Sequence, residues 1–153
     1  RVLFVCLGNI CRSPTAEGVF QQALARAGLT QRIDIDSCGV GDWHVGKAPD
    51  PRAQAAARRR GVDISHLRAR QLTVNDFHAF DYVLGRDRDN LAAIRALQPA
   101  DSQAKTGLLL EYAGLPNTDV PDPYYGGEEG FEQVLDMIEQ ASAGLIDELT
   151  RGR

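Results

Sequence analysis

Cysteine is scarce in this chain of 153 residues, which holds only Cys6, Cys11 and Cys38. An odd number this small does not suit the disulfide framework of a small secreted domain. We therefore expect reduced thiols and a reducing compartment, and the cytoplasm is the predicted location. The three histidines, scattered through the sequence, do not combine with these cysteines at the spacing of a zinc site, so no metal is predicted.

Long apolar runs and an excess of basic residues are also missing. No apolar stretch approaches the ~20 residues that cross a membrane, so we predict no membrane association. With 17 Lys and Arg against 21 Asp and Glu, the net charge is −4, which excludes the overall basic surface typical of nucleic-acid binding. No repeat, low-complexity tract or Gly/Ser-rich linker marks a boundary. The length then predicts a single domain over residues 1–153.

Strand-like and helix-like segments alternate along the chain. Apolar or alternating runs predict strands over residues 2–5, 33–37, 80–84 and 106–110. Apolar residues at the helical period predict four helices. The first has Pro14 at its first position, the second is opened by Asp50-Pro51, the third follows the third strand and carries Leu91, and the last includes Phe131. Asp87 is expected to be a helix N-cap. This alternation indicates an α/β protein of three layers, α/β/α, with a central four-stranded parallel sheet.

The stretch FVCLGNICRSPTAE joins the first predicted strand to the first predicted helix. Ligands of parallel sheets bind beyond the carboxyl ends of the strands, where Cys6 lies. Gly8 allows a turn whose backbone N–H groups point inward, and these groups would surround an oxyanion together with the helix N-terminus. The planar guanidinium of Arg12 could bind two oxygens of a phosphate. The same surroundings favour a Cys6 thiolate, to which the Ser13 hydroxyl would donate. The simpler alternative is that Cys6 is a small buried apolar residue.

The motif C-x-x-x-x-x-R-S at residues 6–13, with D-P-Y-Y at 122–125, resembles the low-molecular-weight protein tyrosine phosphatases. Segments 37–53, 66–72, 80–91 and 120–127 resemble the same family in order. The resemblance implies a phosphate-binding loop after the first strand of a four-stranded parallel sheet. It also implies hydrolysis of phosphotyrosine monoesters through a phosphocysteine, with no cofactor and no metal. The chain departs from the usual family pattern at Gly85-Arg86 and at Cys38.

The resemblance assigns roles to particular residues. Cys6 is the implied nucleophile, Arg12 the phosphate ligand, and Asp122 the general acid that later acts as base. Asp122 stands between two prolines and before two glycines, a pattern that by itself is equally typical of a turn. The resemblance further implies a phosphate-binding loop and its surroundings: loop residues Leu7, Gly8, Asn9, Ile10, Cys11 and Ser13, supporting residues Ser37 and His66, and aromatic pocket walls Trp43, Tyr124 and Tyr125.

The implied partners are phosphotyrosine-containing proteins or peptides, with phosphate-like oxyanions as inhibitors. In relatives the tyrosine pair also accepts phosphate from kinases, which leaves a tyrosine kinase as a further partner of Tyr124 and Tyr125. Cys11 has two interpretations. It either packs beneath the loop or traps an oxidised Cys6 as a disulfide, which would make Cys6 a redox-sensitive cysteine.

Three other functions remain open. A phosphoarginine phosphatase would share the scaffold, but such relatives tend to carry Thr where Ile10 stands. An arsenate reductase would need further cysteines as a relay, and only Cys38 is left for it. A phosphate-binding module without catalysis would not require Cys6, Arg12 and Asp122 together.

Overall fold

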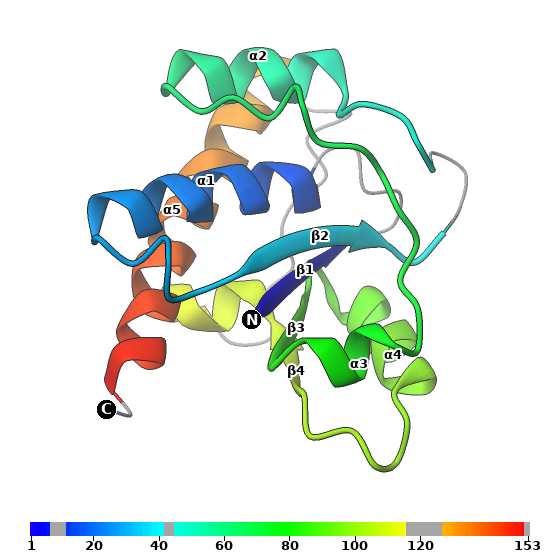
Figure 1. Ribbon diagram of the computed structural model, residues 1–153. Helices are drawn as coiled ribbons and strands as arrows, with labels where there is room; N and C mark the ends of the chain where they lie inside the picture. The colour runs from blue at the N-terminus through cyan, green and yellow to red at the C-terminus, as the bar shows by residue number, and fades with distance from the viewer. Residues whose placement is uncertain (7–11, 42–44, 116–126, 152–153) are drawn as a thin grey trace.

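The computed structural model describes residues 1–6, 12–41, 45–115 and 127–151 (Figure 1). None of the described helices is long and apolar enough to cross a membrane. The elements follow in the order β1 (Val2–Cys6), α1 (Arg12–Arg26), β2 (Ile35–Gly39), α2 (Pro51–Arg59), α3 (Asp76–Ala79), β3 (Tyr82–Gly85), α4 (Arg88–Leu97), β4 (Lys105–Leu108), the 3₁₀ helix η1 (Leu109–Ala113) and α5 (Gly127–Arg151).

The four strands form one parallel sheet in the order β2-β1-β3-β4. This confirms the predicted four-stranded parallel sheet. The strand β1 lies between β2 and β3, and its Val5 is aligned with Cys38 on one side and Gly85 on the other. From β1 the chain moves first to one side of the sheet and later to the other. The carboxyl ends of β1 and β3 therefore flank the switch point at which ligands of such sheets bind.

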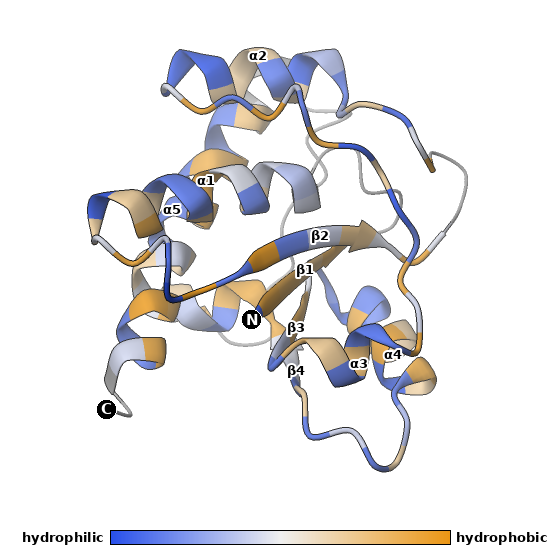
Figure 2. Ribbon diagram, in the orientation of Figure 1, coloured by the Kyte–Doolittle hydropathy of each residue, from blue (hydrophilic) through white to orange (hydrophobic). Residues whose placement is uncertain are grey.

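Both faces of the sheet are covered, which confirms the three-layer α/β/α fold (Figure 1). Val2 and Phe4 of β1 belong to a core cluster that includes residues of α1, α2 and α5. Leu3 and Val5 belong to a second cluster that includes residues of α3 and α4. Because alternate residues of a strand point to opposite faces, a doubly covered strand must be apolar throughout, as Figure 2 shows for β1.

Several boundaries differ from the sequence predictions. The helix α1 begins at Arg12, so Pro14 is its third residue instead of its first. That position is still within the first turn, where a missing N–H costs no intrahelical bond. The last strand, β4, ends at Leu108, and the chain continues as η1. The short helix α3 was not predicted. The predicted N-cap Asp87 is confirmed, because its side chain accepts a hydrogen bond from Asn90 N at 2.7 Å.

The long helix α5 packs against η1 at a glycine. A Cβ atom built on Gly144 would collide with the carbonyl oxygen of Tyr112, a backbone atom that cannot rotate away. The missing side chain therefore allows α5 to approach η1 closely.

We predict that Gly144→Ala destabilises the protein by about 1–3 kcal/mol, the usual cost of overpacking. Intrinsic helix propensity alone would predict a gain of about 1 kcal/mol from the same substitution. Urea unfolding followed by circular dichroism measures the difference. The exposed Gln140 of the same helix gives the control, since Gln140→Ala should change stability by less than about 0.5 kcal/mol. A Gly144→Ala variant more stable than the wild type would contradict the close packing.

Candidate functional site

The thiol of Cys6 lies against the N-terminus of α1. Cys6 and Ser13 are both buried, and Cys6 Sγ is 2.8 Å from Ser13 Oγ. Ser13 is the second residue of α1, and the first turn of this helix contains no acidic residue. The partial positive charge of the helix end therefore acts on the sulfur without an opposing carboxylate in that turn. This arrangement can stabilise negative charge on the sulfur and on an anion bound next to it.

The hydroxyl of Ser13 has a second acceptor, the carbonyl oxygen of Cys38, at 3.3 Å. A hydroxyl has one proton to donate, so the two acceptors compete for it. An ionised sulfur is the stronger acceptor, because hydrogen bonds to charged groups are stronger than those to neutral ones. Ser13 can therefore respond to ionisation of Cys6 by moving its proton toward the sulfur.

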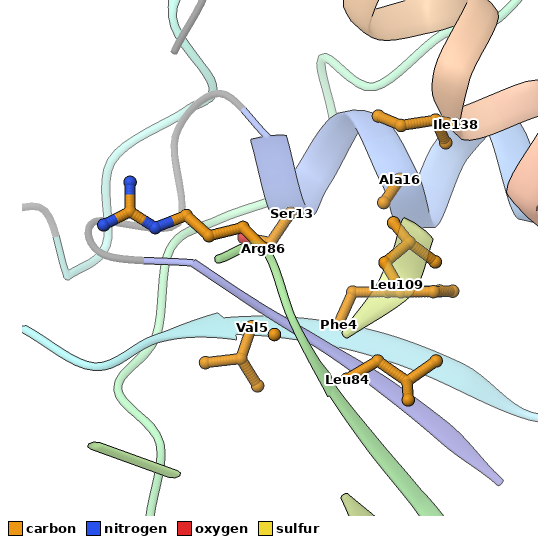
Figure 3. Close-up of a pocket in the computed structure, with 9 residues that line it drawn as sticks. Phe4, Val5, Ser13, Ala16, Leu84, Arg86, Leu109 and Ile138 are labelled. Carbon is orange, nitrogen blue, oxygen red and sulfur yellow. The ribbon is translucent and has the colours of Figure 1, made fainter. Parts of the chain in front are cut away.

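A small, mostly apolar pocket lies beneath the start of α1 (Figure 3). Its volume of about 10 Å³ is enough for about one water molecule, so it is not a substrate pocket. Phe4, Ser13, Ala16 and Leu84 contribute to its walls. Arg86 lines the same pocket, but its guanidinium points away from the apolar side chains, and its Nε lies 3.1 Å from Asp87 Oδ2. Ser13, which contacts the Cys6 thiol, thus also lines a small cavity within the core.

Ser37, predicted as a supporting residue, lies next to a carboxyl group of α1. Its hydroxyl donates to Glu17 Oε1 at 2.7 Å. Burial raises the pKa of Glu17 to about 7; the hydrogen bond from Ser37 and the charge of Arg70 lower it, and the charge of Asp36 raises it. Glu17 follows Ser13 by four residues, one helical turn. An acid that titrates near neutral pH thus stands one turn behind the group that contacts the thiol.

Asp36, the nearest charged neighbour of Ser37 in sequence, is held by Arg70. Arg70 Nε donates to Asp36 Oδ2 at 2.9 Å, and its two terminal nitrogens donate to the carboxylate of Asp76 at 3.1 Å each. The two carboxylates raise the pKa of Arg70, so the guanidinium stays charged. This ion-pair group compensates acidic side chains that would otherwise add negative charge behind the site.

His66, the other predicted supporting residue, is exposed and lines a cavity of about 380 Å³ between α1 and the chain after α2. Glu17, Gln21 and Asp63 line the same cavity. The structure therefore brings His66 to the side of Glu17. The hydrogen bond that the resemblance implies between His66 and the loop network stays a prediction.

Other predicted residues lie outside the described part of the chain: Leu7, Gly8, Asn9, Ile10, Cys11, Trp43, Asp122, Tyr124 and Tyr125. Arg12 begins α1, and only its backbone is described. The roles assigned to these residues stay predictions. Within residues 1–6, 12–41, 45–115 and 127–151, no group of three His, Cys, Asp or Glu side chains could hold a metal ion.

Cys38 points to the opposite face of the sheet from Cys6. It is aligned with Val5 and belongs to the same core cluster as Val5, whereas Cys6 is two residues beyond Phe4 and shares its face. Burial raises the pKa of the Cys38 thiol well above its ordinary value. An inert thiol on the far face does not support a cysteine relay from Cys6, so the arsenate reductase interpretation loses its remaining candidate.

Two residues near Cys6 were missed by the sequence analysis. Glu17 hydrogen-bonds Ser37, and the buried Asn90 donates from Nδ2 to the carbonyl oxygen of Cys6 at 3.4 Å. The sequence indicated that both residues are unusual, because each is a polar residue within the apolar stripe of its helix. The sequence pattern does not show which residue each one would hydrogen-bond, because the partners, Ser37 and Cys6, lie far away along the chain.

Comparison with known proteins finds consistent relatives. A model of the family "Low molecular weight phosphotyrosine protein phosphatase" matches residues 1–153. The low molecular weight phosphotyrosine protein phosphatase of Schizosaccharomyces pombe is 52% identical over 134 residues, covering 86% of this chain and 85% of that protein. The crystal structure of a protein tyrosine phosphatase from Entamoeba histolytica, with Hepes in its active site, superposes with a TM-score of 0.93 at 38% identity, covering 99% of this chain and 97% of that one. A Drosophila arginine phosphatase superposes with a TM-score of 0.90 at 28% identity, covering 100% and 99%.

The raised pKa of Glu17 predicts a stability that falls as the pH rises. The folded protein holds this proton up to about pH 7, whereas an unfolded chain releases it near 4.5. Stability from this group is therefore complete below pH 4.5 and is lost as the pH rises toward 7. In Glu17→Gln this loss should be absent, and the variant should gain roughly 1–3 kcal/mol over the wild type between pH 5 and pH 8. Urea unfolding of both proteins at pH 5 and at pH 8 tests this prediction. An equal pH dependence of stability in the two proteins would refute it.

Proposed function

Because this chain belongs to the low molecular weight phosphotyrosine protein phosphatases and is a protein-tyrosine-phosphatase, we propose that it works through a phosphocysteine formed on Cys6. One observation supports this most directly. The thiol of Cys6 lies 2.8 Å from the Ser13 hydroxyl at the N-terminus of α1, beyond the carboxyl end of the central strand. A nucleophilic thiolate and an incoming phosphate dianion both need the positive surroundings that a helix N-terminus provides.

In the first step, Cys6 Sγ attacks the phosphorus of a phosphotyrosyl group. The S–P bond forms as the P–O bond to the tyrosine breaks, and Asp122 gives its proton to the departing phenolate oxygen. Arg12 and the loop amides bind the non-bridging oxygens of the phosphoryl group and stabilise their negative charge in the transition state. The products of this step are tyrosine, phosphocysteine and the Asp122 carboxylate.

In the second step, Asp122 takes a proton from water, whose oxygen attacks the phosphorus. The S–P bond breaks, inorganic phosphate leaves, and the Cys6 thiolate is restored. Ser13 serves this step because its hydroxyl stabilises sulfur as the leaving group. Every charge in both steps is met by a side chain or by the backbone, so we propose no metal and no cofactor.

The proposed partners follow from the same site. The substrates are phosphotyrosine-containing proteins or peptides, with Trp43, Tyr124 and Tyr125 stacking on the aryl ring. Phosphate-like oxyanions compete with the substrate for the phosphate-binding site formed by the loop and Arg12. Oxidation linking Cys6 to Cys11 and phosphorylation of the tyrosine pair by a kinase are the proposed modes of regulation. The proposed location is the cytoplasm, where thiols stay reduced.

We predict that Cys6→Ser abolishes release of phosphate from para-nitrophenyl phosphate, because a hydroxyl is not ionised by these surroundings. Asp122→Ala should lower kcat by roughly 10²–10⁴-fold, the usual contribution of general acid–base catalysis. Steady-state assays over a range of pH measure both effects. Full activity of Cys6→Ser would refute the nucleophile, and a small loss in Asp122→Ala would mean that another group donates the proton.

Substrate preference separates this proposal from its alternatives. The aliphatic side chain of Ile10 argues for phosphotyrosine, whereas the fold is shared with an arginine phosphatase. We expect phosphate release from phosphotyrosine peptides to exceed release from phosphoarginine peptides, with no reduction of arsenate. Reversed preference would assign the chain to phosphoarginine, and oxyanion binding without turnover of either peptide would leave a binding module.

A further inference from the structure

Asn90 connects the turn between β3 and α4 to the carboxyl end of β1. Its side chain is buried, with Nδ2 donating to the Cys6 carbonyl oxygen at 3.4 Å and Oδ1 accepting from Arg86 N at 3.0 Å. Its backbone N–H donates to the N-cap carboxylate of Asp87 at 2.7 Å. Three hydrogen bonds thus fix this one residue, and one of them ends on the backbone of the proposed nucleophile.

The contact to Cys6 adds a second donor to a carbonyl oxygen that already has its bond within the sheet. On the β2 side, the Cys6 carbonyl accepts from Val40 N at 2.9 Å. On the β3 side, the register with β1 ends at Val5 and Gly85, so no β3 residue is aligned with Cys6. The amide of Asn90 supplies a donor where the strand has already turned into α4. The backbone of Cys6 is therefore held by the chain at the end of β2 and by the first turn of α4.

Gly85 makes the approach of Asn90 sterically feasible. A Cβ on Gly85 would lie 2.9 Å from Asn90 Oδ1 and 3.1 Å from Ile94 Cδ1, both too close for unstrained packing. The next residue, Arg86, donates its backbone N–H to Asn90 Oδ1. Gly85, Arg86 and Asn90 thus form one packed unit beside the carboxyl end of β1.

We propose that Asn90 is a positioning residue of this enzyme, one that holds the Cys6 backbone so that Sγ stays in contact with Ser13 and the N-terminus of α1. This rests on the proposed role of Cys6 as nucleophile. A donor to the carbonyl of Cys6 limits rotation of the chain at the point where it leaves the sheet. Small displacements of a reacting atom lower rates by up to about 10²-fold, so the effect should be visible in catalysis.

The test measures the alkylation of Cys6 by iodoacetamide as a function of pH, with the Cys6 peptide quantified by mass spectrometry. In Asn90→Ala we expect alkylation at pH 6 to be up to about ten-fold slower than in the wild type and the pH profile to move to higher pH, because Sγ is no longer held against Ser13. We also expect kcat/KM for para-nitrophenyl phosphate to fall roughly 10–100-fold. If Asn90→Ala does not fold, Asn90→Leu gives the same comparison with a similar volume and no added charge.

Asp89→Ala is the matched control, because Asp89 is an exposed residue in the first turn of the same helix and no bond of Asn90 depends on its side chain. It should leave the alkylation profile unchanged. The proposal is overturned if Asn90→Ala keeps the wild-type profile, or if Asp89→Ala shifts it equally. A wild-type protein without enhanced alkylation at pH 6 and without turnover would instead refute the proposed function itself.

Discussion

The proposed function depends on one contact, that of the Cys6 sulfur with the first turn of α1. Burying an ionised group is costly unless dipoles and hydrogen bonds replace the lost water. For the proposed thiolate, the replacement comes from Ser13 and from a helix N-terminus without an acidic residue in its first turn. Both sides of the contact must be rigid for this to work. The central strand is held by parallel neighbours on each side, and α1 packs into the core cluster that covers the face shared by Phe4.

The charge of acidic side chains around the proposed site is reduced in two ways, by burial or by an ion pair with arginine. Glu17 is desolvated, with a pKa of about 7, so a large fraction of it carries no charge at neutral pH. Asp36 and Asp76 share the guanidinium of Arg70, and Asp87 lies beside Arg86. The consequence is that, in a chain of net charge −4, these carboxylates add little negative charge beside the proposed phosphate site. In the proposed function, capture of an anion is a property of the site and not of the whole surface.

Much of the architecture could be predicted from short-range patterns. Strands buried on both faces are continuous apolar runs, as in β1, and capping aspartates mark the starts of α2 and α4. The short helix α3 escaped prediction because its four residues show no helical period. This helix is stabilised by residues that do not belong to it, since the Asp76 carboxylate accepts hydrogen bonds from Thr73 N and from Arg70. The start of α1 at Arg12 was also not predicted. Proline is tolerated at any position of a first helical turn, so Pro14 does not mark which residue begins the helix.

The alternation of strands and long helices, the parallel sheet and the candidate nucleophile with its guanidinium could be predicted from the sequence alone, because each is a matter of residue type and spacing along the chain. Only the tertiary structure decided that Glu17 meets Ser37 and that Asn90 meets Cys6, pairs separated by 20 and 84 positions. It also decided that Cys38 faces away from Cys6. Hydrogen bonds between distant residues and the pKa of a buried acid depend on which surfaces pack together, and packing is a property of the folded chain as a whole.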